Sequence, residues 1–303
     1  MTIHAEPTAA PSPPTRVVTV ANQKGGVGKT TTAVNLGAEL ARRFRVLLID
    51  VDPQANATSS LGIDPGAARA STYEVLLGDA DIDAVILPNV VPGLDLAPSS
   101  RVLAGAQVEL VDLAARERRL EGALAGLVAE GTYDVILIDT PPSLGLLTLN
   151  ALVASDLVLV PVQSEYLALE GLGQLVETLE MVRASLNTRL VLVGILLTML
   201  DSRTRLSAQV AAEVRRHFPA ATFAAEIPRS VRLSEAPSFG RPIRQYDPSS
   251  RGGKAYARLA DELAARLGRG TMPPNGGATD AVADTADVAA SAVEGRRGRA
   301  SAS

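Results

Sequence analysis

Short runs of apolar, often β-branched residues alternate along the chain with longer segments whose apolar residues recur every three or four positions. The short runs are typical of strands buried on both faces, and the longer segments have the periodicity of amphipathic helices. Strands separated by helices predict an α/β fold in a single domain, with a doubly wound, mostly parallel sheet and helices on both faces. The predicted strands are 16–21, 45–51, 94–97, 134–139, 157–162, 190–200 and 222–227, and the predicted helices are 30–43, 114–130, 167–186, 205–218 and 253–267.

The two ends of the chain differ in composition from its middle. Residues 1–15 are rich in Pro, Ala, Ser and Thr, and residues 269–303 are rich in Ala, Gly, Asp and Ser. Such segments bury too little surface to offset the entropy of ordering, so we expect both to be disordered and the folded domain to span 16–268. The apolar run 190–200 is too short for a membrane helix, and the N terminus lacks the features of a secretory signal. We therefore expect a cytoplasmic protein with no membrane partner.

Composition and charge narrow the chemistry. The 303-residue chain has no cysteine, which excludes disulfides, thiolate catalysis and a cysteine-ligated iron–sulfur cluster. Its net charge of −4 argues against a generally basic protein, but an average can hide a patch. Residues 201–258 contain eleven Arg or Lys against five Asp or Glu, a local charge of +6. The positive charge is therefore segregated in one region of the chain.

A glycine-rich loop, ANQKGGVGKTTT, follows the first predicted strand. Glycines let backbone N–H groups converge on an anion, and the start of a helix adds its dipole, so a chance turn is the weaker interpretation. We expect Lys29 to reach the β- and γ-phosphates of a nucleotide and the Thr30 hydroxyl to bind Mg²⁺. The usual glycine is replaced by Gln23, and a second lysine, Lys24, stands inside the loop. The predicted nucleotide contacts are Lys24, Gly25, Gly26, Val27, Gly28, Lys29, Thr30 and Thr31.

Two predicted strands end in aspartates. Asp50 and Asp52 are two residues apart, so they point to the same side where the second strand leaves the sheet. The carboxyl ends of parallel strands face the ligand crevice, which favours Asp52 as the residue that orients the attacking water. A helix cap or turn is the alternative for both, and for Asp50 the two interpretations are equally open. The run VILIDTPPSLG has the form of a Walker B strand, so Asp139 is expected to hold Mg²⁺ through a water.

The loop KGGVGKT resembles the signature KGGxGK[ST] of the ParA/MinD family of deviant-Walker ATPases, and DVDPQ matches that family's water-positioning aspartate. The resemblance implies weak intrinsic hydrolysis of ATP with Mg²⁺ as cofactor, and catalytic roles for Lys24, Lys29 and Asp52. It also implies an ATP-dependent homodimer in which Lys24 reaches the partner's phosphates, as an arginine finger does. No guanine-reading Asn-Lys-x-Asp string follows the Walker B strand, which favours adenine. By the same resemblance Pro228 and Arg229 lie near the base, with a simple strand-ending turn as the alternative.

The segments LTMLDSRTRLS and IPRSVRLSEAPSFGRPIRQYDPSSRGGKAY closely resemble chromosomal ParA (Soj) proteins. This resemblance implies DNA partitioning: an ATP-bound sandwich dimer binds double-stranded DNA non-specifically, and hydrolysis releases it. Arg203 and Arg232 match the positions that contact DNA in that group. A ParB-like partner that stimulates hydrolysis and a nucleoid-associated location are implied as well. For the arginines, a solvated face paired with acidic residues is the alternative.

Other functions share parts of this pattern. A MinD-like membrane-cycling ATPase would carry the same loop, but the final residues, DVAASAVEGRRGRASAS, contain no aromatic or leucine anchor for an amphipathic membrane helix. A biotin-pathway synthetase would be indifferent to DNA, and the nitrogenase iron protein is excluded by the absence of cysteine. A ParA relative that positions plasmids or protein cargo stays open, because the sequence does not identify the cargo.

Overall fold

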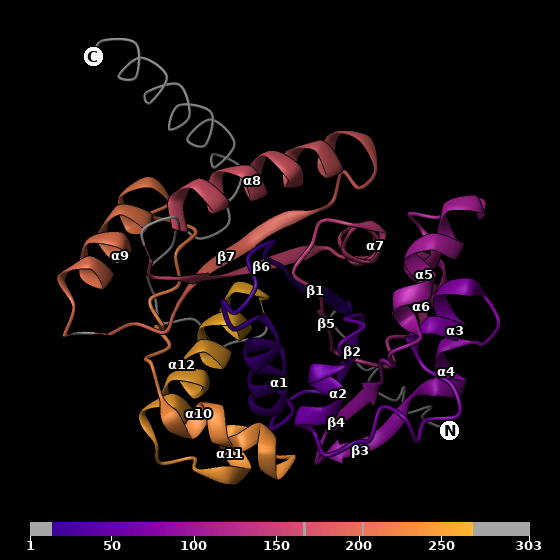
Figure 1. The fold of residues 1–303 in the computed structure, drawn as a ribbon, viewed down its shortest axis with the longest axis horizontal. Helices are drawn as coiled ribbons and strands as arrows, with labels where there is room; N and C mark the ends of the chain where they lie inside the picture. The colour runs from indigo at the N-terminus through magenta and orange to yellow at the C-terminus, as the bar shows by residue number, and fades with distance from the viewer. Residues whose placement is uncertain (1–13, 166–167, 202, 269–303) are drawn as a thin grey trace, which may run out of the picture.

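The computed structural model describes residues 14–165, 168–201 and 203–268. These residues form a seven-stranded sheet in the order β3-β4-β2-β5-β1-β6-β7, in which all neighbours pair in parallel except β3 with β4 (Figure 1). The α/β fold with a mostly parallel sheet is confirmed. The strands are β1 (Arg16–Val20), β2 (Val46–Asp50), β3 (Leu87–Val91), β4 (Leu94–Ala97), β5 (Val135–Asp139), β6 (Leu157–Gln163) and β7 (Val191–Thr198).

Side chains along the central strands alternate between two cores, one on each face of the sheet. In β2, Val46 and Leu48 join one core, whereas Leu47 and Ile49 join the other. All four side chains are fully buried. Because both faces are covered, every position of such a strand has to be apolar, which explains why these strands lack a polar face.

Helices cover both faces of the sheet. In Figure 1, α8 lies along one side of the sheet and α1 with α12 along the other. The face of α1 and α12 also carries α2, α10, η2 and α11. The helices on this face are α1 (Lys29–Leu40), α2 (Asn56–Ser60), α10 (Val231–Glu235), η2 (Ala236–Phe239), α11 (Ile243–Tyr246) and α12 (Arg251–Arg266). The helices on the other face are α3 (Thr72–Leu77), α4 (Ile82–Val85), α5 (Leu103–Glu109), η1 (Leu110–Asp112), α6 (Arg119–Glu130), α7 (Leu146–Ala154), α8 (Ala168–Ser185) and α9 (Arg205–His217).

The strand predicted at 222–227 is wrong. The backbone there makes one isolated bridge to β7, at Thr222, and two hydrogen bonds, from the N–H groups of Phe223 and Ile227. A regular ladder does not form, because the N–H groups of Ala224 and Ala225 donate instead to the carboxylate of Glu262, each at 3.0 Å. The neighbouring Arg266 guanidinium donates to the carbonyl oxygens of β7 and of this segment. Two side chains of α12 therefore interrupt the ladder that a further strand would have made, and together with the segment they cover the edge of β7.

Other bounds differ from the expectations by smaller amounts. The helix predicted at 114–130 begins only at Arg119, since Ala115 has a φ of 51° and interrupts the helical backbone. The antiparallel strand β3 and the helices α3, α5 and α7 were not predicted, because each is short or lacks a clear period. The segments 1–13 and 269–303 lie outside the described residues, whereas Thr15 is already buried and donates to the carbonyl oxygen of Tyr133 at 2.7 Å. No helix among the described residues is long and apolar enough to span a bilayer.

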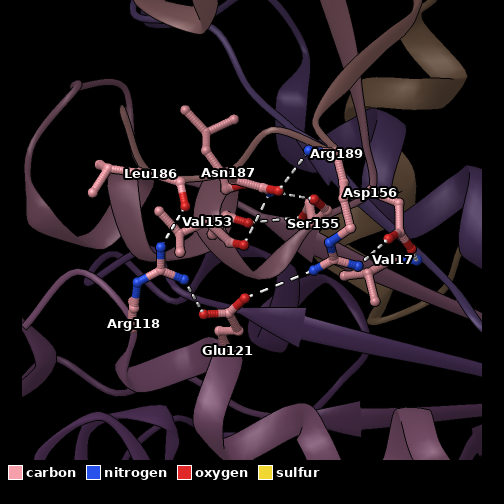
Figure 2. A network of polar contacts seen from close by, with 11 residues as sticks. Val17, Arg118, Glu121, Val153, Ser155, Asp156, Leu186, Asn187 and Arg189 are labelled. Atoms are coloured by element: carbon pink, nitrogen blue, oxygen red, sulfur yellow. Dashed lines mark hydrogen bonds and ion pairs between the residues drawn. The ribbon is translucent and has the colours of Figure 1, made fainter. Parts of the chain in front are cut away.

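We call the amino ends of β1, β6 and β7 the amino edge. There, the side chain of Asn187 caps the C-terminal end of α7 (Figure 2). The amide nitrogen of Asn187 lies 3.0 Å from the carbonyl oxygens of Leu152 and Val153 and 2.6 Å from that of Ser155. Its side-chain oxygen accepts from the backbone N–H of Arg189 at 3.1 Å. These contacts satisfy carbonyl groups that the end of a helix leaves without partners.

An aspartate at the same edge joins β1 to the segment that leads into β7. The Asp156 carboxylate accepts from the backbone N–H of Val17 at 3.1 Å and from the Arg189 guanidinium at 3.0 Å. Arg189 also lies 3.7 Å from Glu121 of α6, which pairs with Arg118 (Figure 2). The amino edge is therefore a network in which the buried polar groups have partners.

Candidate functional site

The loop between β1 and α1 is braced by side chains from other parts of the chain. The Asn22 side chain donates to the carbonyl oxygen of Pro161 at 2.7 Å and accepts from the backbone N–H of Lys24 at 2.9 Å. From the end of β7, the Thr198 hydroxyl donates to the carbonyl oxygen of Val27 at 2.9 Å. The loop is thus fixed at both ends before any ligand is bound. Sequence reasoning missed Asn22 and Thr198, because neither belongs to a recognisable motif.

The backbone of this loop has the shape that the glycines predicted. Gly26 and Gly28 have φ angles of 74° and 88°, a left-handed region that side chains with a Cβ avoid, and α1 begins at Lys29 as expected. The Lys29 side chain is buried, and its ammonium group donates to the carbonyl oxygen of Lys24 at 3.3 Å. Burial lowers the pKa of Lys29, and the nearby carboxylates of Asp139 and Asp52 oppose that shift. The structure therefore brings the predicted lysine and both predicted aspartates together.

Asp139, the last residue of β5, is the most unusual group of the site. It is fully buried, and within the part of the chain that the structure describes neither carboxylate oxygen has a hydrogen-bond partner of normal geometry, although the Thr30 hydroxyl lies close enough to affect its pKa. Burial raises the pKa of Asp139 well above its usual value, as does Asp50, whereas the Thr30 hydroxyl and Lys29 oppose the rise. Buried polar atoms are almost always partnered, so two empty acceptors beside a threonine hydroxyl fit a hydrated Mg²⁺ ion.

The two aspartates at the end of β2 have different environments. Asp50 is fully buried and accepts from the N–H and hydroxyl of Thr58, at 2.9 and 2.8 Å, and from the N–H of Asp52 at 3.1 Å. Burial raises the pKa of Asp50 to about 6. These contacts give Asp50 the structural role, because it anchors α2. Asp52 accepts from the N–H of Gln54 at 2.9 Å and acts to raise the pKa of Lys29, so the structure leaves it a candidate site residue.

Lys24 points away from its own loop toward the segment after β6. Its ammonium group lies 2.9 Å from the carboxylate of Glu165, and both side chains are close to half exposed. The neighbouring Gln23 donates to the side chain of Gln174 on α8 at 3.2 Å. Sequence reasoning missed Glu165, since nothing in the local sequence marks it. The side chain of the second lysine is thus engaged by a carboxylate outside the loop, although its backbone carbonyl contacts Lys29.

The predicted base-contacting residues lie at the end of β7, which also touches the phosphate loop. Pro228 forms an isolated bridge with Leu200, and the backbone N–H of Arg229 donates to the carbonyl oxygen of Leu200 at 3.0 Å. One residue earlier, the Met199 side chain approaches Gly28, lying 3.9 Å from the position that a Cβ would take there. The arrangement places Pro228 and Arg229 at the same end of the sheet as the loop.

The predicted DNA-contacting arginines are engaged by carboxylates. Arg203, which is 83% exposed, makes a two-point contact with Asp201 at 2.7 and 2.9 Å and holds the pKa of that carboxyl well below its usual range. Arg232 of α10 lies 3.0 Å from Glu235 and 3.5 Å from Asp247. Exposed ion pairs of this kind contribute little to stability, so they can exchange for other anions.

Comparison with known proteins decides the family. The family model described as AAA domain matches residues 15–192. The sporulation initiation inhibitor protein Soj of Bacillus subtilis (strain 168) is 54% identical over 251 residues, which cover 82% of this chain and 98% of that protein. The chromosome partitioning protein ParA of Caulobacter vibrioides is 51% identical over 254 residues, covering 84% and 95%. The chain belongs to the ParA/Soj family. Membership confirms the family predicted from the phosphate loop.

Solved structures support the fold of this ParA/Soj family member. A cobyrinic acid a,c-diamide synthase from Mycobacterium smegmatis, with bound ATP analog and magnesium, matches with a TM-score of 0.74 and 42% identity, over 87% of this chain and all of that one. The septum site-determining protein MinD from Pyrococcus horikoshii, complexed with Mg-ADP, matches with a TM-score of 0.67 and 25% identity, over 82% and 96%. The P-loop fold in a single domain is therefore confirmed for this ParA/Soj chain.

Proposed function

We propose that this chain is a DNA-partitioning ATPase whose ATP-bound dimer binds DNA non-specifically and releases it on hydrolysis. The observation that carries the proposal is the Asp139 carboxylate, which is buried beside Lys29 with neither oxygen partnered among the described residues. A buried, unpartnered carboxylate is costly, and a hydrated Mg²⁺ bound with a nucleotide supplies the partners that it lacks. Identity above 50% to proteins named for chromosome partitioning supports DNA as the cargo.

The site residues divide the work of ATP hydrolysis among them. The backbone N–H groups of residues 24–31 and the Lys29 ammonium would bind the phosphates. Thr30 and Asp139 would hold Mg²⁺, Asp139 through a water. When bound, the metal neutralises charge that develops on the phosphate oxygens during hydrolysis. Asp52 would orient the attacking water, and Pro228 with Arg229 would contact the adenine. This division assigns a role to each predicted site residue at the carboxyl ends of the parallel strands, which we call the carboxyl edge.

The second lysine supports a dimer. Only the backbone carbonyl of Lys24 contacts Lys29 among the described residues, whereas the Lys24 ammonium group pairs with Glu165. In a sandwich of two copies it would reach the partner's phosphates and stabilise charge in the transition state. Arg203 and Arg232 would exchange their carboxylates for DNA phosphates, and a ParB-like partner would stimulate hydrolysis. The location that follows is the cytoplasm, in association with the nucleoid.

A second candidate function is ATP-dependent synthesis of a small molecule. It is favoured by the 42% identity to a chain described as cobyrinic acid a,c-diamide synthase. Such an enzyme would need a substrate beside the nucleotide and would be indifferent to DNA. Measuring ATP hydrolysis with and without duplex DNA separates the two candidates, because only the partitioning ATPase is expected to respond to DNA.

The proposal is tested most directly with Asp52→Ala. This variant is expected to bind ATP and Mg²⁺ but to hydrolyse ATP slowly, so that an ATP-bound dimer accumulates. Light scattering after size exclusion would detect the dimer, and anisotropy of a labelled duplex would detect DNA binding by it. Phosphate release at the wild-type rate would contradict the role of Asp52, and the absence of ATP-dependent DNA binding would contradict the partitioning function.

A further inference from the structure

Three cations on α12 take no part in the site described above. Arg251, Lys254 and Arg258 are three and four residues apart, so they follow one another along one face of the helix. All three side chains are exposed, whereas Tyr256 and Leu263 on the opposite face are buried in the core. We call the three residues the α12 cation row. Its positions are fixed by the packing of the helix that carries it.

The α12 cation row forms one wall of a groove of about 600 Å³. Helix α9 provides the facing wall through residues that include Ala211 and Arg215, and the rest of the lining comes from Leu200, Asp201 and the irregular segment 224–228. In Figure 1, α9 and α12 lie on either side of the end of β7. No residue of the phosphate loop lines this basic groove among those that the structure describes. Pro228, proposed above to contact the adenine, does line it, so the groove borders the proposed base site and is distinct only from the phosphate loop.

The charges of the basic groove are not balanced within the protein. Its two lining carboxylates are already engaged, Asp201 by Arg203 and Glu226 by Arg215. The α12 cation row makes no ion pair or side-chain hydrogen bond with any residue in the described ranges 14–165, 168–201 and 203–268. By contrast, Arg203 and Arg232 would each have to leave a carboxylate before they could bind an outside anion. Binding an anion at the α12 cation row breaks no such contact.

We infer that the α12 cation row contacts the phosphate backbone of DNA, so that the basic groove belongs to the DNA-binding surface. The inference rests on the proposed function, in which DNA is the partner. Arg203 pairs with Asp201 of the groove lining, which places the arginine predicted from sequence at the rim of the same surface. Contacts of Lys and Arg with backbone phosphates carry no sequence information. The row therefore supplies affinity and salt dependence, and no sequence preference.

The experiment measures duplex affinity by fluorescence anisotropy at several salt concentrations, with the full chain and a slowly hydrolysed ATP analogue. Each lost phosphate contact lowers the salt slope by about 0.9, and a dimer carries every residue twice, so Lys254→Gln with Arg258→Gln is expected to lower the slope by about 3 to 4. Affinity at moderate salt is expected to fall by at least about 10-fold, equally for duplexes of different sequence. Arg42→Gln with Arg183→Gln removes the same charge outside the groove and is expected to leave both quantities unchanged.

Each outcome bears on one claim. Wild-type affinity and slope in the α12 variant, with DNA binding lost in Arg203→Ala, would overturn the inference and leave the proposed function standing. A wild-type chain that binds the ATP analogue but no DNA would overturn the proposed function itself. The charge-retaining variant Lys254→Arg with Arg258→Lys is expected to bind DNA like the wild type. If it binds as weakly as the glutamine variant, packing and not charge is responsible, and the inference fails.

Discussion

At the amino edge of the sheet, Asp156 and Asn187 use their polar atoms on backbone groups and on Arg189, whereas at the carboxyl edge Asp139 lies buried with neither oxygen partnered in the described chain. Both edges belong to one rigid sheet, and both bury polar side chains. They differ in where the partners come from. At the amino edge the protein supplies them, and at the carboxyl edge a ligand has to.

This difference predicts opposite responses to substitution. Removing a polar group at the amino edge leaves buried donors or acceptors without partners, which lowers stability and leaves the chemistry intact. Removing a polar group at the carboxyl edge is expected to abolish ATP hydrolysis. In the protein without nucleotide it also removes the free-energy cost of burying a group that has no partner. Each of the following substitutions tests one side of the comparison.

The largest effect is expected for Lys24→Ala at the carboxyl edge. Loss of a cation supplied in trans lowers the turnover of phosphoryl-transfer enzymes by about 10³ to 10⁵. The variant should still bind ATP through Lys29, fail to dimerise with it, and unfold at the wild-type denaturant midpoint, because Lys24 makes only an exposed ion pair. Single-turnover hydrolysis and sedimentation with ATP measure these properties. Wild-type turnover would remove Lys24 from the catalytic site.

At the amino edge, Asn187→Ala is expected to lower the free energy of unfolding by about 2 to 4 kcal/mol, since it leaves buried carbonyl groups at the end of α7 without a donor. The rate of ATP hydrolysis per folded molecule should stay unchanged. Urea unfolding monitored by circular dichroism gives the stability, and Gln245→Ala, at an exposed position, serves as the control. If Asn187→Ala kept wild-type stability but hydrolysed ATP slowly, the amino edge would serve catalysis, and the comparison of the two edges would be wrong.

Asp139→Asn should have a smaller effect on stability, and in the opposite direction. Burial raises the pKa of Asp139, so the folded chain binds this proton more tightly than the unfolded chain does. The cost of the ionised group is therefore absent at low pH and grows as the pH rises. Without nucleotide, the variant is expected to be more stable by about 1 to 3 kcal/mol at pH 8, with a smaller difference at pH 5. Urea unfolding at several pH values tests this, and a gain independent of pH would contradict it.

The smallest effect is expected for Glu165→Gln, which frees Lys24 from its exposed ion pair. Such pairs are worth about 0.2 to 1 kcal/mol, and two are released per dimer, so ATP-dependent dimerisation should strengthen by a few-fold to about 30-fold. Sedimentation with a slowly hydrolysed ATP analogue measures the change. In the Lys24→Ala background the same substitution should have no effect. A weaker dimer in the wild-type background would mean that Glu165 stabilises the dimer interface.

Contiguous motifs made the carboxyl edge predictable. The phosphate loop, Asp52 and Asp139 could be proposed because strand, loop and helix follow one another directly, and the strands could be predicted because they are mostly apolar. Glu165 and Thr198 could not be found, since their partners in the loop lie 141 and 171 residues away. The strand expected at 222–227 failed for a related reason. Glu262, on a helix far along the chain, takes the hydrogen bonds that a strand would have used.

The contacts of Glu262 and Arg266 with β7 and its neighbouring segment also bear on how copies of this protein can associate. An uncovered edge strand offers a row of free backbone N–H and C=O groups to the sheet of a second molecule, and such pairing can continue from molecule to molecule as a polymer. Here, Glu262 occupies two N–H groups of the segment beside β7, and Arg266 occupies the Val193 carbonyl oxygen. A protein that depends on reversible pairing through one face benefits from this cover, because it disfavours open-ended polymerisation through that edge of the sheet.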